Sequence, residues 1–175
     1  MVGLARSGLA ASEALVAQGA SVVACDVRAD LEVGRLRELS VEVHLASEEE
    51  TLLKGIDLVV TSPGVPVDVP PIAGAHAREI PVWSELELGA RLLPNAILAV
   101  TGTNGKTTTT ALLGEIFRAA DRPAEVAGNI GRALTSKPTT AAPCPTRASA
   151  AARPARARPI TSTLRPRSSV VAVTP

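Results

Sequence analysis

Short apolar runs alternate with amphipathic segments along most of this chain. The runs have the length and β-branched character of buried strands, and the segments between them repeat apolar residues every three or four positions. We predict strands at 21–25, 41–44, 56–61, 80–83, 96–100 and 125–127, and helices at 9–19, 31–39, 71–78, 84–92 and 107–120. Strands that alternate with helices favour an α/β fold with a parallel sheet.

The sequence also predicts a helix N-cap, the packed face of one helix and a short first strand. Ser47, followed by three glutamates, resembles a helix N-cap with acids in the first turn. In the helix that follows residue 106, an apolar stripe is predicted to pack on the sheet, and it consists of Leu112, Leu113, Ile116, Phe117 and Ala120. The strand expected before the first helix is reduced to Met1 and Val2.

The strand at 96–100 opens into the sequence T-G-T-N-G-K-T-T at 101–108. Glycines allow a backbone to approach a polyphosphate, and the N–H groups of a following helix then face its charge. Lys106 is placed to reach the β- and γ-phosphates, and the Thr107 hydroxyl to bind the Mg²⁺ between them. The spacing G-x-x-G-K-T is shorter than the common G-x-x-x-x-G-K-[ST] loop. The alternative is an ordinary glycine turn.

Further loops follow other predicted strands. The turn at 3–8 has glycines at both ends, and Asp26 ends the second strand, where Rossmann-type domains meet a ribose or base. The alternatives are a turn without a ligand and an aspartate that caps the next helix. Ser62-Pro63-Gly64 forms a turn after a strand, and Asn129 lies in a second glycine loop at 128–131 that is expected to face substrate or to be a left-handed turn.

Composition divides the chain near residue 137. The 175 residues carry a net charge of +1, but residues 1–136 carry −6 and residues 137–175 carry +7, with no acid and no glycine. We therefore expect a Rossmann-like domain at 1–94, the start of a P-loop ATP-binding α/β domain at 95–136, and a disordered tail at 137–175. Out-of-frame translation of a GC-rich gene is the favoured source of the tail, and a functional basic arm is the alternative.

The sequence also favours some cellular settings over others. It has no apolar run long enough to span a bilayer and no signal peptide, so we expect a cytoplasmic protein without a membrane or nucleic-acid partner. Cys25 and Cys144 make neither a disulfide framework nor a metal site.

Taken in order, these motifs resemble those of the Mur ligases. The resemblance covers about residues 1–136 and rests on the loop at 3–8, Asp26-Val27-Arg28, the turn at 61–66, the E-L-E-L sequence at 85–88, the loop at 101–108 and G-N-I-G at 128–131. It implies ATP-dependent addition of D-glutamate to UDP-N-acetylmuramoyl-L-alanine through an acyl phosphate. Family members continue into a Mg²⁺-binding glutamate, a histidine, a carbamylated lysine and a C-terminal domain, for which this sequence shows no match.

The resemblance also assigns roles to residues. It implies that ATP is bound by Gly102, Thr103, Asn104, Gly105, Lys106, Thr107 and Thr108, with Mg²⁺ on Thr107 and with Lys106 and Asn129 as catalytic residues. It implies that the UDP-sugar is held by Leu4, Ala5, Arg6, Ser7, Asp26, Val27, Arg28, Ser62, Pro63, Gly64 and Asn129. The alternatives are another ligase of the superfamily, such as a folylpolyglutamate synthase, and a module that binds ATP or a UDP-sugar without catalysis.

Overall fold

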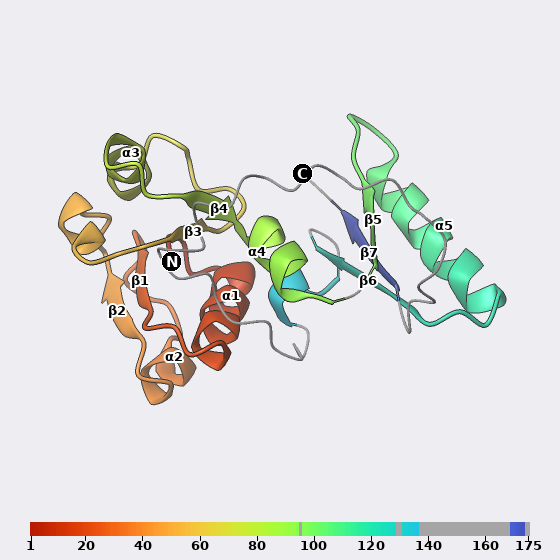
Figure 1. Cartoon of the computed structure of the whole chain (residues 1–175), viewed down its shortest axis with the longest axis horizontal. Helices are drawn as coiled ribbons and strands as arrows, with labels where there is room; N and C mark the ends of the chain where they lie inside the picture. The colour runs from red at the N-terminus through yellow and green to blue at the C-terminus, as the bar shows by residue number, and fades with distance from the viewer. Residues whose placement is uncertain (95, 129–130, 137–168, 174–175) are drawn as a thin grey trace.

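A computed structural model of the chain describes residues 1–94, 96–128, 131–136 and 169–173. Within these residues, strands alternate with helices and every ladder is parallel, as the sequence pattern predicts. Figure 1 shows one group that contains β1 to β4 with α1 to α3, a second group that contains β5 to β7 with α5, and α4 between them. The elements are α1 (Arg6–Ala17), β1 (Val23–Asp26), α2 (Gly34–Glu38), β2 (Glu42–Leu45), η1 (Glu50–Leu53), β3 (Val59–Thr61), α3 (Pro70–Ala77), β4 (Val82–Ser84), α4 (Glu85–Leu92), β5 (Ala96–Val100), α5 (Lys106–Ala119), β6 (Ala124–Gly128), η2 (Leu134–Ser136) and β7 (Ser169–Val173).

Val2 joins β1 and β3 into one parallel arrangement. It bridges to Cys25 on one side and to Thr61 on the other. Its N–H donates to the carbonyl oxygen of Val60 over 2.8 Å, and its own carbonyl accepts from the N–H of Ser62 over 2.9 Å. Val2 therefore occupies the position between β1 and β3 at which the sequence predicts the first strand. The spatial order is therefore β2, β1, Val2, β3 and β4, and the direction in which the chain adds strands reverses at Val2.

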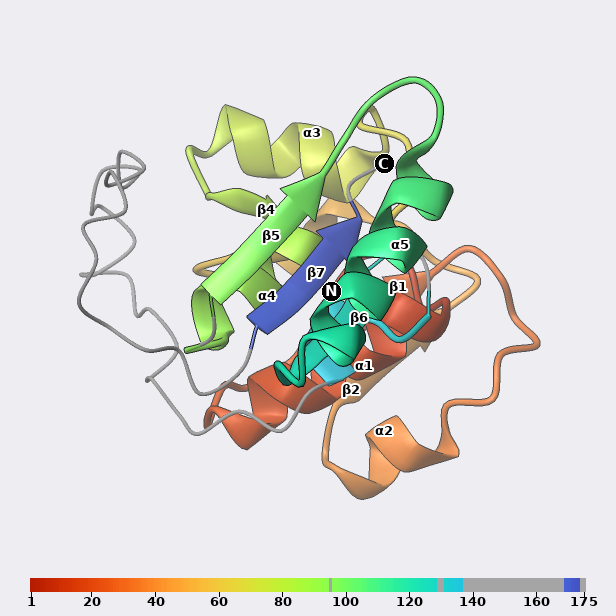
Figure 2. The same ribbon diagram turned by 90° about the vertical axis from the view of Figure 1, so that its right-hand side faces the viewer.

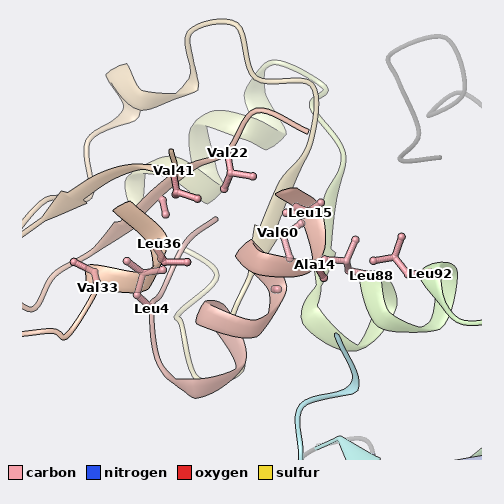
Figure 3. Close-up of a cluster of buried hydrophobic side chains, with 12 residues drawn as sticks. Leu4, Ala14, Leu15, Val22, Val33, Leu36, Val41, Val60, Leu88 and Leu92 are labelled. Atoms are coloured by element: carbon pink, nitrogen blue, oxygen red, sulfur yellow. The ribbon is translucent and has the colours of Figure 1, made fainter. Parts of the chain in front are cut away.

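The core of the first group is aliphatic, as expected for a chain almost without aromatic residues. Leu4, Leu36 and Leu88 are completely buried, and side chains from α1, α2, β1, β3 and α4 meet around them (Figure 3). Because α4 contributes Leu88 and Leu92 to this cluster, the helix that leads into the second group is anchored in the first.

The second sheet has the order β5, β7, β6, and α5 lies beside it (Figure 2). Within the predicted tail, residues 169–173 form β7, which pairs with β5 and with β6 over five residues each. This segment is rich in valine, which favours extended backbone, and a position between two strands offers it partners on both edges. Residues 137–168 and 174–175 lie outside the described part of the chain.

The predicted apolar stripe of α5 is partly wrong. Leu112 and Ile116 are 58% and 52% exposed, whereas Thr110 is buried and Leu113 and Phe117 are half-buried. The packed face of α5 therefore contains residues 110, 113, 114 and 117. A Cβ added to Gly114 would lie 2.9 Å from Cγ2 of Val126, so glycine permits the close approach of β6 that fixes the rotation of the helix.

One serine caps a helix, whereas the N-cap predicted at Ser47 is wrong. Ser84 caps α4 as the serine before an acidic first turn should, because its Oγ accepts from the N–H of Glu87 over 3.1 Å. Ser47 does not cap a helix: its N–H donates to the carbonyl of Asp26, and only the short 3-10 helix η1 follows, with Glu49 before it. No helix in the described ranges is long and apolar enough to cross a bilayer.

Candidate functional site

Two glycines allow the first turn to pack against the start of α1. Gly3 has a φ of +87°, and a Cβ there would lie 2.6 Å from Cγ2 of Val65. A Cβ on Gly8 would lie only 1.9 Å from the carbonyl oxygen of Gly3. The glycines of this turn therefore have the two roles expected in a nucleotide-binding turn, namely an unusual backbone angle and close packing of the helix.

Asp26 fastens this turn to the end of β1. Its Oδ2 accepts from the N–H of Leu4 over 2.6 Å, and its Oδ1 accepts from the N–H of Arg28 over 2.9 Å. The guanidinium of Arg28 adds bonds of 3.0 Å to each oxygen. The hydrogen bond from Arg28, and then those from the two backbone N–H groups, lower the pKa of the carboxyl group to about 2 although burial opposes the shift.

The carboxylate of Asp26 is buried and bound to protein groups, whereas Val27 and Arg28 beside it are exposed. The alternative that Asp26 caps the next helix is wrong, because α2 begins at Gly34 and its N-cap position is Val33. Asp26 thus shapes the turn through which α1 begins, and Val27 and Arg28 present their side chains to solvent at the same end of the sheet.

The loop after β3 contacts the turn at residues 3–8 through two serines. The hydroxyls of Ser7 and Ser62 lie 2.9 Å apart, within hydrogen-bond distance. Ser62 is buried, whereas Pro63 and Gly64 after it are exposed. This contact joins the start of α1 to the loop after β3, so the two loops form one edge of the site.

A pocket of about 190 Å³ opens at this edge. It lies at the carboxyl end of the parallel strands and beside the reversal of strand order at Val2, where open α/β sheets bind ligands. Its walls come from both groups of elements and consist of Ala5, Arg6, Ser7, Pro63, Glu85, Leu86, Gly128 and Ala133. A larger cavity of about 570 Å³ lies at the other end of β1 and β3, away from the loops that the sequence motifs mark.

The structure therefore gathers most of the predicted UDP-sugar residues. Ala5, Arg6, Ser7 and Pro63 line the pocket, and Asp26 and Ser62 hold its loops in place. The side chain of Leu4 belongs to the hydrophobic core, so only its backbone serves the site. The predicted residue Asn129 lies outside the described residues.

The loop after β5 leads directly into α5. Gly105 is the residue before the helix, with a φ of +76°, and no cap hydrogen bond to the first N–H groups is made by a side chain in the described part of the chain. The side chain of Lys106 extends back toward the start of the loop, where its Nζ donates to the carbonyl oxygen of Gly102 over 2.5 Å. Thr103, Asn104, Thr107 and Thr108 are exposed. Uncapped N–H groups, a lysine above them and an exposed threonine hydroxyl fit a phosphate chain with its metal ion.

One buried carboxylate has no role in the sequence prediction. Glu85, at the first position of α4, is 1% exposed and accepts from both the N–H and the hydroxyl of Thr135. The two residues are 50 positions apart, and the E-L-E-L sequence gives no sign that its first glutamate is buried. Only the tertiary structure brings Thr135 to it.

Two family models match the chain. The model described as Mur ligase MurD-like, N-terminal domain, matches residues 1–84. The model described as Mur ligase middle domain matches residues 100–156.

Curated relatives agree with these matches. The UDP-N-acetylmuramoylalanine--D-glutamate ligase of Pelotomaculum thermopropionicum is 47% identical over 141 residues, which cover 78% of this chain and 31% of the relative. The enzyme of the same name from Geotalea uraniireducens is 45% identical over 138 residues, which cover 77% of this chain and 30% of the relative. The chain thus spans about a third of the length of these relatives.

Among solved structures, the chain is similar to the UDP-N-acetylmuramate-alanine ligase of Thermotoga maritima. The TM-score is 0.47 at 26% identity, and the match covers 70% of this chain and 29% of that one.

Proposed function

The chain belongs to the Mur ligase family, and we propose that it forms the UDP-sugar half-site and the ATP half-site of a D-glutamate-adding ligase. The substrate of this reaction is UDP-N-acetylmuramoyl-L-alanine. Its terminal carboxylate takes the γ-phosphoryl group of ATP, and the amine of D-glutamate then displaces phosphate to form the new amide bond. The reaction belongs to peptidoglycan synthesis, and we assign it to the cytoplasm.

The cluster of Leu4, Asp26 and the Ser7–Ser62 pair is the observation that supports this proposal most strongly. It holds three loops at the strand-order reversal, beside the uncapped start of α1, whose N-cap residue is Ala5. Free N–H groups at a helix N-terminus favour a diphosphate. Arg6 is exposed and adds positive charge for the UDP group, whereas the charge of Arg28 is paired with Asp26.

The second half-site is the loop at Gly102 to Thr108. Lys106 and the first N–H groups of α5 would neutralise the phosphates of ATP, and the hydroxyl of Thr107 would hold Mg²⁺. Magnesium, when bound, withdraws charge from the γ-phosphate as the substrate carboxylate attacks it. The bond from Lys106 to Gly102 keeps the ammonium group over the loop before the nucleotide arrives.

Isothermal titration calorimetry tests the proposal. We expect the purified chain to bind UDP-N-acetylmuramoyl-L-alanine and Mg·ATP at separate sites, each with a stoichiometry of one. UDP-glucose, which shares the nucleotide but lacks the lactoyl-alanine arm, is the control for the sugar-peptide part. A chain that binds ATP but neither UDP nor the UDP-sugar would contradict the first half-site.

Incubation of the chain with all three substrates tests catalysis separately. Formation of UDP-N-acetylmuramoyl-L-alanyl-D-glutamate would show that these residues suffice for the reaction, whereas binding of both ligands without product would show that they supply the two half-sites alone.

A further inference from the structure

The buried carboxylate of Glu85 joins the two halves of the pocket. Its Oε1 accepts from the backbone N–H of Thr135 over 2.9 Å and from the Thr135 hydroxyl over 2.7 Å. A buried charged group is costly unless hydrogen bonds replace its water, and the first position of a helix further favours a negative charge. These bonds therefore fix η2 relative to α4.

Close packing beside this carboxylate strengthens the same contact. Leu134 is fully buried, and a Cβ added to Gly89 would lie 2.7 Å from its Cγ. Gly89 is four residues after Glu85, so both lie on one face of α4. On that face, Leu134 packs into a gap that only glycine leaves open. Thr135, the next residue, binds the same face through its two hydrogen bonds to Glu85.

The contact lies between the two walls of the pocket. One wall belongs to the first group of elements and contains Ala5, Arg6, Ser7 and Pro63. The opposite wall contains Gly128 and Ala133, and Ala133 immediately precedes η2. Glu85 and Leu86 line the pocket between the walls. The bonds from Glu85 to Thr135, together with the packing of η2 on α1 and α4, therefore help to set the distance between the two walls.

We infer that Glu85 is a positioning residue for the sugar-peptide end of the UDP-sugar. The inference rests on the proposed function. The hydrogen bonds that join the loops at Leu4, Asp26 and Ser62 are all made within the first group. We therefore expect these loops to keep their arrangement around the nucleotide when the Glu85–Thr135 bonds are lost, although η2 also packs against α1. The muramoyl-alanine arm extends from the nucleotide toward the second wall. Loss of the Glu85–Thr135 contact leaves the nucleotide site intact and lets the second wall move away from the arm.

Calorimetry with two ligands separates this role from a general effect on stability. We expect Glu85→Ala to bind UDP within twofold of the unchanged chain and to bind UDP-N-acetylmuramoyl-L-alanine at least tenfold more weakly. Glu85→Gln keeps an oxygen that accepts from the N–H and the hydroxyl of Thr135, so it should restore most of the affinity. Glu87→Ala is the matched control, because Glu87 is exposed on the same helix and pairs with Arg91.

Thr135→Val is the second variant, in case Glu85→Ala does not fold. It keeps the shape of the side chain and removes only the hydroxyl donor. We therefore expect the affinity for the UDP-sugar to fall threefold or more and the affinity for UDP to be unchanged. Thr135→Ser should behave as the unchanged chain. Amide hydrogen exchange at 131–136 should be faster in Glu85→Ala and normal in Glu85→Gln.

Equal losses for the two ligands, or no loss for either, would overturn the inference and leave the proposed function standing. Failure of the unchanged chain to bind the UDP-sugar would overturn the proposed function itself, together with the role given to Glu85.

Discussion

The backbone N–H of Leu4 donates to Oδ2 of Asp26 over 2.6 Å, so the residue that ends one strand holds the turn that begins α1. Arg28 binds both oxygens of the same carboxylate. The position of the first glycine turn therefore depends in part on the charge of this side chain, beside the backbone bond from Gly3 to Cys25, and that charge can be removed by substitution or by acid.

We expect Asp26→Asn to lower the free energy of unfolding by about 2 kcal/mol at pH 7, because a carboxamide turns a donor toward groups that are donors themselves. The ordinary pKa of an aspartate is 3.8, and that of folded Asp26 is about 2. A carboxyl group with a lowered folded pKa stabilises the fold fully above its unfolded pKa, and this stability is lost as the pH falls from about 4 through about 2.

Urea unfolding at pH 7, 4 and 2.5 measures this effect. The difference between the unchanged chain and Asp26→Asn should be constant from pH 7 to about pH 5 and should shrink toward pH 2.5. Asp68→Asn, which alters an exposed carboxylate, is the control. A difference that stays constant down to pH 2.5 would contradict the assignment of the charge effect to Asp26.

Gly8→Ala should destabilise the first group of elements by about 3 kcal/mol or more. The new Cβ would lie 1.9 Å from the carbonyl oxygen of Gly3, and a backbone atom held by its neighbours cannot move aside cheaply. Gly34→Ala is the matched control, since its Cβ would meet only the flexible carboxylate of Glu32 at 3.0 Å. Thermal unfolding followed by circular dichroism compares them, and equal melting temperatures would contradict the packing argument.

Ser7→Ala and Ser62→Ala should each lower the free energy of unfolding by about 1 kcal/mol. The double variant should lower it by less than the sum of the two, because one hydrogen bond joins the two side chains. A double-mutant cycle by urea unfolding measures the coupling. We also expect each single variant to weaken UDP binding, since the bond sets the distance between two loops of the site. Additive effects on stability would show that the hydroxyl contact contributes nothing.

The order of strands and helices could be predicted from the sequence because apolar runs and helix caps are local signals. Ser84 and the acids after it, for example, specify the start of α4 without help from other elements. Contacts between distant segments could not be predicted in the same way. The rotation of α5 depends on the approach of Val126 to Gly114, and the burial of Glu85 depends on Thr135.

In the candidate site, too, local features could be predicted from the sequence and contacts between distant residues could not. Sequence patterns marked the loops that line the pocket, since glycines and prolines at strand ends are visible in a single sequence. They did not show that Asp26 is bound to Leu4 and Arg28, or that the side chain of Leu4 is in the core. They also gave residues 169–173 to a disordered tail, because a strand with partners on both edges depends on β5 and β6, far away in the sequence.

Lys106→Ala should reduce ATP affinity at least a hundredfold and leave affinity for the UDP-sugar within twofold. The ammonium group lies over the loop of the second group, whereas the UDP loops belong to the first. Lys54→Ala, which removes an exposed lysine elsewhere, is the control. Calorimetry with each ligand measures both affinities. An equal loss of both would contradict the assignment of two separate half-sites.

Thr107→Val tests the metal position on its own. Valine has the shape of threonine without the hydroxyl, so we expect a tenfold or greater loss of affinity for ATP in excess magnesium and little change for ATP with a chelator present. Thr107→Ser keeps the hydroxyl and should bind Mg·ATP almost normally. Thr109→Val, two residues further along α5 and also exposed, is the matched control for the loss of a threonine. If Thr107→Val and Thr109→Val weakened Mg·ATP binding equally, or if the loss persisted without magnesium, the hydroxyl of Thr107 would not be a metal ligand.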